Sequence, residues 1–198
     1  MPRIKLPVDF KKAVSQMPDG DKNKLLFRLL AKEPALVEKL AFELLEGGET
    51  TEERRADLER ETEQHLINYQ NYFYTPGYLQ MELRSISGEI TRHVKTTKDK
   101  YGEVYLNLFM LNKCMELYNQ KVIPFNPINS RTFNEYVVKR TLKIYDLLGK
   151  LHEDYLADFK PDLKKLGKEI GKNHNMMKVA IYNMLDVNWL LKGILPDY

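Results

Sequence analysis

Apolar residues recur at helical spacing from the first quarter of the chain onward. The earliest clear stripe consists of Leu25, Leu26, Leu29 and Leu30. A second stripe runs from Leu36 to Leu44, with Pro34 in the position of a first helical turn and Gly47-Gly48 after its end. The pattern predicts short helices joined by turns over residues 1–46.

A polar helix is predicted next, over residues 49–73. Thr50 and Glu53 form a capping-box pattern, and apolar residues are scarce in the first half of this segment. Aromatic residues gather in its second half, before the break at Thr75-Pro76. We therefore expect the beginning of this helix to be solvated and its end to be buried.

The segment after this break allows two interpretations. A stripe at helical spacing consists of Leu79, Leu83, Ile86, Ile90 and Val94. β-Branched residues between 89 and 97, followed by the turn-like KDKYG, instead suit a small β-hairpin at residues 89–108. Arg92 would interrupt the alternation of the first strand, so the helix is favoured.

Two long buried helices are predicted in the rest of the chain. Residues 104–117 are apolar on two faces, which is typical of a central helix. Ser130 is placed to cap a helix whose apolar stripe continues to Tyr155, and Lys160-Pro161 is expected to end it. Two prolines between these helices predict a loop at residues 123–130.

These elements predict an all-α fold, either an irregular multi-helical bundle or a short α-α superhelix. A chain of 198 residues suits a single helical domain, residues 1–198, and is long enough to bury a core. The loop at 123–130 is the best candidate for a break between two subdomains, residues 1–122 and 131–198.

The composition is that of a folded protein, with 43% hydrophobic and 30% charged residues. Its 31 basic and 28 acidic side chains leave a formal charge of +3, which is too small to imply a nucleic-acid partner by itself. Cys114 is the only cysteine, so no internal disulfide can form. No run approaches the about 18 apolar residues of a membrane span, so we expect a cytoplasmic protein with no membrane partner.

The most pointed functional pattern is LGKEIGKNHNMMKVAIYNML, residues 166–185. Its glycines and apolar positions resemble the helix-turn-helix family, although Lys172 stands where that family buries an apolar side chain. The resemblance implies a DNA-binding segment at residues 163–185. The residues that would face DNA are Lys164, Lys168, Lys172, Asn173, His174, Asn175 and Lys178. An ordinary pair of helices that meet at Gly171 is the alternative, and it is favoured.

Carboxylate–imidazole pairs suggest a second chemistry, that of a metal-dependent enzyme with ligands on helices. The candidate ligands are Glu61, His65, Glu82, Glu89 and His93. The pairs have the spacing Glu-x-x-x-His, whereas di-iron bundles use Glu-x-x-His. A surface pair is therefore the simpler interpretation, and the sequence indicates no cofactor.

Five aromatic rings lie in YQNYFYTPGY, residues 69–78, where local charge is low. The candidate protein-binding residues are Tyr69, Tyr72, Tyr74 and Tyr78, because tyrosine is common in protein interfaces. The chain contains no nucleotide-binding or common hydrolase motif. We predict a non-catalytic interaction or scaffold protein that binds another protein or forms a homo-oligomer. DNA binding is the first alternative, and metal-dependent catalysis is the second.

Overall fold

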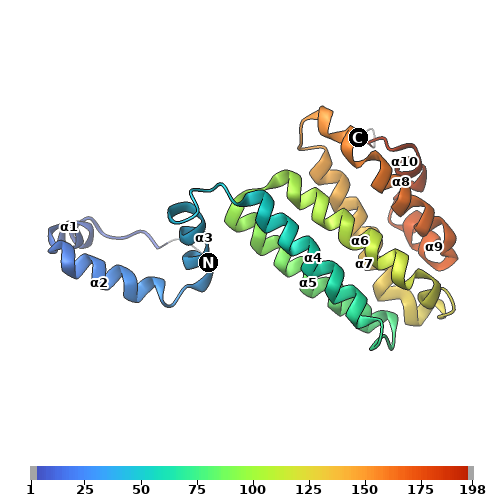
Figure 1. Cartoon of the computed structure of the whole chain (residues 1–198), viewed down its shortest axis with the longest axis horizontal. Coiled ribbons are helices and arrows are strands. Elements are labelled where there is room, and N and C mark those ends of the chain that lie inside the picture. Colours follow the sequence, from blue (N-terminus) through green and yellow to red (C-terminus); the bar gives the residue numbers. More distant parts are fainter. Residues whose placement is uncertain (1–3, 196–198) are drawn as a thin grey trace. The chain divides into compact units, whose positions relative to one another are not determined.

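The computed structural model describes residues 4–195, and every regular element in that range is helical. Ten α-helices and one short 3-10 helix follow one another in this part of the chain (Figure 1). The all-α prediction is confirmed. The chain divides into two compact units, unit 1 (Met1–Gly48) and unit 2 (Glu49–Tyr198). The division lies at the Gly47-Gly48 turn, whereas residues 123–130 lie inside unit 2.

Unit 1 consists of three short helices, as the apolar stripes predict. They are α1 (Val8–Gln16), α2 (Asp19–Leu30) and α3 (Pro34–Leu44). Pro34 begins α3, where its missing N–H costs no helical hydrogen bond. Gly47 and Gly48 both adopt positive φ angles of 62° and 76°, a conformation that glycine reaches without steric cost.

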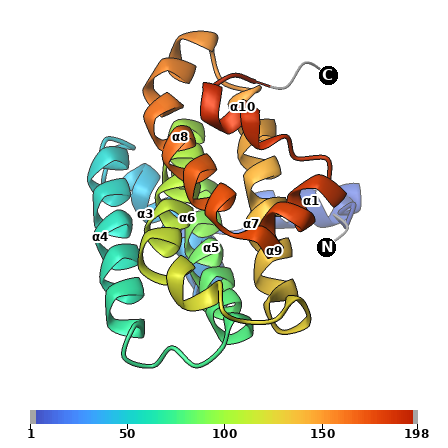
Figure 2. The ribbon, with the colours of Figure 1, turned by 90° about the vertical axis from the view of Figure 1, so that its right-hand side faces the viewer.

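Unit 2 contains the remaining helices. They are α4 (Thr51–Tyr69), α5 (Pro76–Thr97), α6 (Lys100–Val122), α7 (Pro127–Leu148), η1 (Glu153–Tyr155), α8 (Leu156–Lys172), α9 (His174–Tyr182) and α10 (Val187–Lys192). Helix α6 packs against α4, α5, α7 and α8, while α9 packs on α7 and α10 packs on α8 (Figure 2). Unit 2 is therefore a helical bundle arranged around α6. No helix between residues 4 and 195 is long and apolar enough to cross a membrane.

The central position of α6 follows from its sequence, which is apolar on more than one face. Leu106, Met110, Leu111 and Tyr118 are at most 1% exposed, and so is Cys114. Burial raises the pKa of the Cys114 thiol far above its usual value, which makes this cysteine unreactive. The prediction of a buried central helix at residues 104–117 is confirmed.

Residues 89–108 form the end of α5 and the start of α6, so the hairpin alternative is wrong. Lys98 adopts the left-handed conformation, with a φ of 64°, and ends α5. Asp99 then caps α6, because its Oδ1 accepts a hydrogen bond of 2.7 Å from the backbone N–H of Gly102. The turn-like KDKYG therefore joins two helices rather than two strands.

The long helix predicted from Ser130 to Lys160 is also wrong. Helix α7 ends at Leu148, and α8 begins at Leu156 and continues through Pro161. Pro161 lies in the second turn of α8, where its missing N–H removes one helical hydrogen bond but does not end the helix. The break after α7 lets α8 pack along α6.

Candidate functional site

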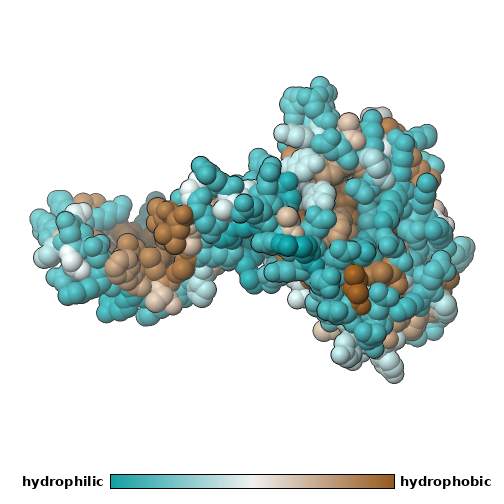
Figure 3. Space-filling model, in the orientation of Figure 1, coloured by the Kyte–Doolittle hydropathy of each residue, from teal (hydrophilic) through white to brown (hydrophobic). Residues whose placement is uncertain are grey.

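Unit 1 leaves most of its large apolar side chains in contact with solvent. Among residues 4–48, the described part of this unit, only Phe42 is buried, with 5% of its surface exposed. Eleven large apolar side chains are exposed: Ile4, Leu6, Val8, Phe10, Leu26, Phe27, Leu29, Leu36, Val37, Leu44 and Leu45. We call these eleven residues the unit 1 apolar surface, and Figure 3 shows apolar residues gathered on this unit. Apolar side chains that gather on the surface of one unit are typical of an interaction site.

The predicted tyrosine cluster lies in unit 2, at the corner between α4 and α5. Tyr72, Tyr74 and Tyr78 are exposed, and the rings of Tyr74 and Tyr78 lie 6.3 Å apart. Tyr69 is half-buried and packs against the buried ring of Tyr118 at 6.1 Å. Three of the four tyrosines are therefore accessible, and the fourth belongs to the core contact between α4 and α6.

The segment that resembles a helix-turn-helix consists of α8 and α9, which are joined by Asn173 alone. Asn173, which we expected to face outward, is instead 2% exposed. Its Oδ1 caps α9 by accepting a hydrogen bond of 3.1 Å from the N–H of Met176, and its Nδ2 donates to Asn119 Oδ1 on α6. Asn173 therefore serves as a structural cap.

The other six residues that were predicted to face DNA differ in their exposure and in their contacts. Four of them are exposed and make no ion pair with a described residue: Lys164, Lys168, His174 and Lys178. Lys172 forms an ion pair with Glu169 one turn earlier. The half-buried Asn175 donates a hydrogen bond of 3.2 Å to the carbonyl of Phe125.

Four of the five candidate metal ligands lie in three separate contacts. His65 Nε2 on α4 lies 2.7 Å from Glu82 Oε2 on α5. His93 is buried beside Asp99, and Glu89 forms an ion pair with Arg92. The fifth candidate, Glu61, is exposed. Within residues 4–195, no three His, Cys, Asp or Glu side chains are grouped so that they could hold a metal ion.

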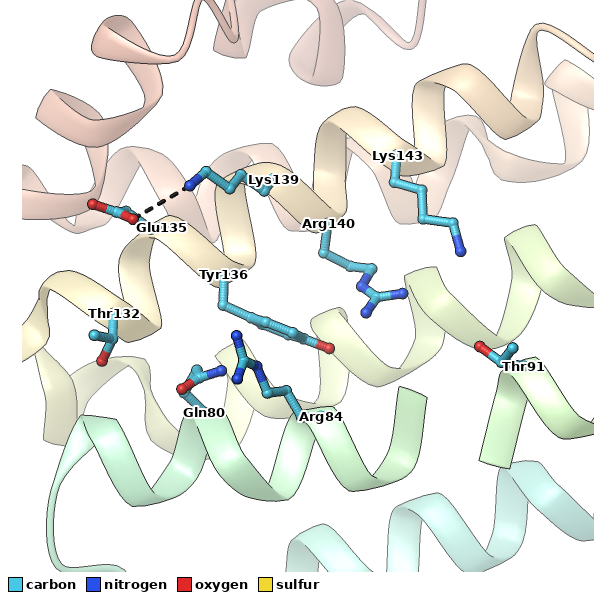
Figure 4. Close-up of a pocket in the computed structure, with 9 residues that line it drawn as sticks. All are labelled: Gln80, Arg84, Thr91, Thr132, Glu135, Tyr136, Lys139, Arg140 and Lys143. Carbon is cyan, nitrogen blue, oxygen red and sulfur yellow. Dashed lines mark hydrogen bonds and ion pairs between the residues drawn. The ribbon is translucent and has the colours of Figure 1, made fainter. Parts of the chain in front are cut away.

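A basic groove of about 610 Å³ lies between α5 and α7 in unit 2 (Figure 4). We call it the α5–α7 groove, and its lining residues are Gln80, Arg84, Thr91, Thr132, Glu135, Tyr136, Lys139, Arg140 and Lys143. Four of these side chains are basic and one is acidic.

Sequence reasoning did not single out the groove. One signal of it was present, because Thr132, Tyr136, Lys139, Arg140 and Lys143 recur at spacings of three and four along one helix.

Comparison of the chain with protein-family models, curated proteins and solved structures finds no match. Two features of the described residues are therefore left to indicate function. One is the unit 1 apolar surface, and the other is the α5–α7 groove.

Proposed function

We propose that this chain is a non-catalytic interaction protein that self-associates through the unit 1 apolar surface. The observation that carries the proposal is the imbalance in this unit between eleven exposed large apolar side chains and one buried side chain. A helical unit with so little core gains stability only when another surface covers its apolar residues.

The size and composition of unit 1 favour association over other means of stabilisation. Very small domains usually depend on disulfides, bound metals or oligomerisation, because a short chain buries a small fraction of its surface. Residues 1–48 contain neither cysteine nor histidine. A disulfide or a Cys/His metal site therefore cannot stabilise this unit, which favours association with another surface.

The energies involved are sufficient for association. Full burial of a Leu, Ile, Val or Phe side chain contributes about 1.5–3 kcal/mol. Association costs about 4–15 kcal/mol in lost translational and rotational freedom. Simultaneous burial of several members of the unit 1 apolar surface therefore offsets this cost.

A second copy of the chain is the partner that we propose. Two copies can bring the same surface together about a two-fold axis, so each apolar side chain meets a surface of matching chemistry. The three short helices of each copy would then share one core.

The test measures the mass of the full chain in solution by size-exclusion chromatography with light scattering. We expect a dimer for the native chain and a monomer for Phe27→Glu, because Phe27 is 65% exposed and a carboxylate there would be buried in the interface. Ile128→Glu is the matched control: Ile128 is 83% exposed in unit 2, and this variant should remain dimeric.

Far-UV circular dichroism of both variants checks that their helices are intact. A native chain that stays monomeric at every concentration would overturn the proposal. A monomer that also fails to bind a hydrophobic dye would show that the apolar surface is covered within a single chain.

A further inference from the structure

We infer that the α5–α7 groove binds a small ligand that carries two or more phosphate groups. The inference concerns unit 2 alone, so it does not depend on the association proposed for unit 1. It rests on the charge of the groove, on the fixed position of one arginine and on the polarity of the lining.

Two arginines from opposite walls supply the positive charge at the middle of the groove. Figure 4 shows Arg84 extending from α5 toward Tyr136, and Arg140 pointing inward from α7. Arg84 is exposed and makes no ion pair or hydrogen bond with a described residue. Arg140 Nη1 donates to the neutral Asn107 Oδ1 at 3.2 Å. Within residues 4–195, neither guanidinium is neutralised by a carboxylate.

The two lysines of the groove are partly neutralised. Lys143 Nζ lies 3.0 Å from Glu103 Oε1, and Lys139 Nζ lies 3.4 Å from Glu135 Oε2. Glu135 also accepts a hydrogen bond of 2.7 Å from Arg131. The uncompensated charge is therefore concentrated on the arginines, whose planar forks match the geometry of phosphate oxygens.

Arg140 is held in position before any ligand arrives. Its guanidinium carbon lies 5.2 Å from the centre of the Tyr136 ring, which places the cation over the aromatic face. The Tyr136 hydroxyl donates a hydrogen bond of 3.0 Å to the carbonyl of Leu83 and forms a second hydrogen bond with the hydroxyl of Ser87. These contacts fix the ring, and with Asn107 they fix the arginine, so binding costs less side-chain entropy.

The lining residues favour a polar ligand. Apart from the aromatic Tyr136 they are polar or charged, and Gln80, Thr91 and Thr132 add amide and hydroxyl groups to the cations. The volume of about 610 Å³ lies within the range of about 300–1,000 Å³ that is typical of small-molecule sites. A hydrated, multiply charged anion fits such a lining better than a peptide or a hydrophobic compound.

The distribution of carboxylates favours a compact ligand over a nucleic-acid backbone. Along α7, Glu135 comes before the basic residues that line the groove, and Glu103 lies beside Lys143 at their other end. A phosphodiester chain that continued past the groove would meet ion-paired residues at both ends, Glu135 with Lys139 and Arg131 at one end and Glu103 with Lys143 at the other, and no further uncompensated cation among the described lining residues. The uncompensated positive charge is instead confined to Arg84 and Arg140 in the groove, which suits a short ligand with adjacent phosphate groups.

Isothermal titration calorimetry of the full chain with inorganic pyrophosphate and inorganic triphosphate tests the inference. The titrations are made at physiological ionic strength, because salt screens weak contacts with exposed charges. We expect one molecule of either compound to bind per chain. Orthophosphate should bind at least about tenfold more weakly, because it carries less charge and fewer oxygens to share between the two arginines.

Variants assign the binding to the groove. Arg84→Gln removes a cation that has no structural partner, so it should weaken triphosphate binding by about tenfold or more without loss of helix content. Arg140→Lys keeps the charge but loses the fork and should also weaken binding. The matched control is Arg92→Gln, an exposed arginine of α5 outside the groove, which should bind as the native chain does.

Three results would overturn the inference. The first is the absence of binding to both compounds. The second is equal weakening by Arg84→Gln and Arg92→Gln, which would indicate general surface charge. The third is tighter binding of duplex DNA than of triphosphate, with a loss of DNA binding in Arg84→Gln. That result would assign the groove to a phosphodiester backbone.

Discussion

Units 1 and 2 are both built from amphipathic helices, but they place their apolar side chains in opposite environments. Leu83 of α5 and Leu111 of α6 are completely buried within unit 2. In unit 1, Leu29 of α2 and Leu44 of α3 are 52% and 75% exposed. An apolar stripe at helical spacing therefore predicts a helix, whereas burial of that stripe depends on whether another element is available to cover it.

The apolar stripes of unit 2 are buried because α6 is surrounded by α4, α5, α7 and α8. Buried asparagines strengthen this arrangement by satisfying backbone groups of α8. Asn112 Nδ2 donates to the carbonyl of Asp162 at 3.0 Å, and Asn119 Nδ2 donates to that of Glu169 at 2.8 Å. Unit 1 has no helix in an equivalent central position among its described residues, so its stripes stay uncovered.

The largest expected difference in stability is between a variant that truncates a core side chain of unit 2 and one that truncates an exposed side chain of unit 1. Leu111→Ala should lower the free energy of unfolding of unit 2 by about 2–5 kcal/mol, because it leaves a cavity in the core. Leu29→Ala, in unit 1, should change the free energy of unfolding of unit 2 by less than about 0.5 kcal/mol. Urea titration followed by the fluorescence of Trp189 measures both, because this single tryptophan packs against the core of unit 2.

Equal losses of stability in the two leucine variants would contradict the difference in burial between the two units. Such a result would mean that Leu29 contributes to the same cooperative core as Leu111.

An intermediate effect is expected from the buried ionic contact at the start of α6. Burial raises the pKa of Asp99, but hydrogen bonds from His93, Arg55 and the N–H of Gly102 outweigh it and lower the pKa to about 2. Arg55 Nε lies 2.7 Å from Asp99 Oδ2. A carboxylate whose pKa is lower in the folded state stabilises that state above its ordinary pKa of 3.8. This stabilisation is lost as the pH falls from there to about 2.

Urea titrations of unit 2 at a series of acidic pH values measure this contribution. The native chain should lose about 2 kcal/mol across that interval through Asp99. Asp99→Asn should be less stable at neutral pH and should lack this component of the pH dependence. An identical pH dependence in both proteins would show that Asp99 does not stabilise unit 2.

The smallest effect concerns the cap between α8 and α9. Asn173→Ala should destabilise unit 2 by about 0.5–2 kcal/mol, because it removes the side-chain oxygen that caps α9. The neighbouring His174→Ala is the control and should have little effect, since His174 is exposed. Thermal unfolding of the two variants measures the difference. A loss of stability in His174→Ala as large as that in Asn173→Ala would contradict the role of Asn173 as the cap.

The helices were largely predictable from the sequence, and their boundaries were less so. The stripe from Leu79 to Val94 and the apolar run at 104–117 gave α5 and α6 correctly. The sequence also placed a helix end at Pro161, but this proline lies within α8. An apolar pattern that continues past Leu148 cannot reveal that the chain turns there, because the stripes of α7 and α8 look alike.

The candidate sites were less predictable than the helices, for two physical reasons. Asn173 looked like a surface residue because asparagine is polar, yet the buried junction between α8 and α9 needs such a side chain as a cap. The α5–α7 groove depends on Arg84 and Arg140, which are far apart in the sequence and come together only when α5 packs on α7. Periodicity within one helix carries no information about that pairing.

The central claim is that a second copy of the chain covers the apolar surface of unit 1. Hydrogen exchange of the backbone amides, measured at increasing protein concentration, tests it directly. We expect exchange in α1, α2 and α3 to slow as the concentration rises, while exchange in the core helices of unit 2 stays constant. Exchange in α1–α3 that is independent of protein concentration would contradict it.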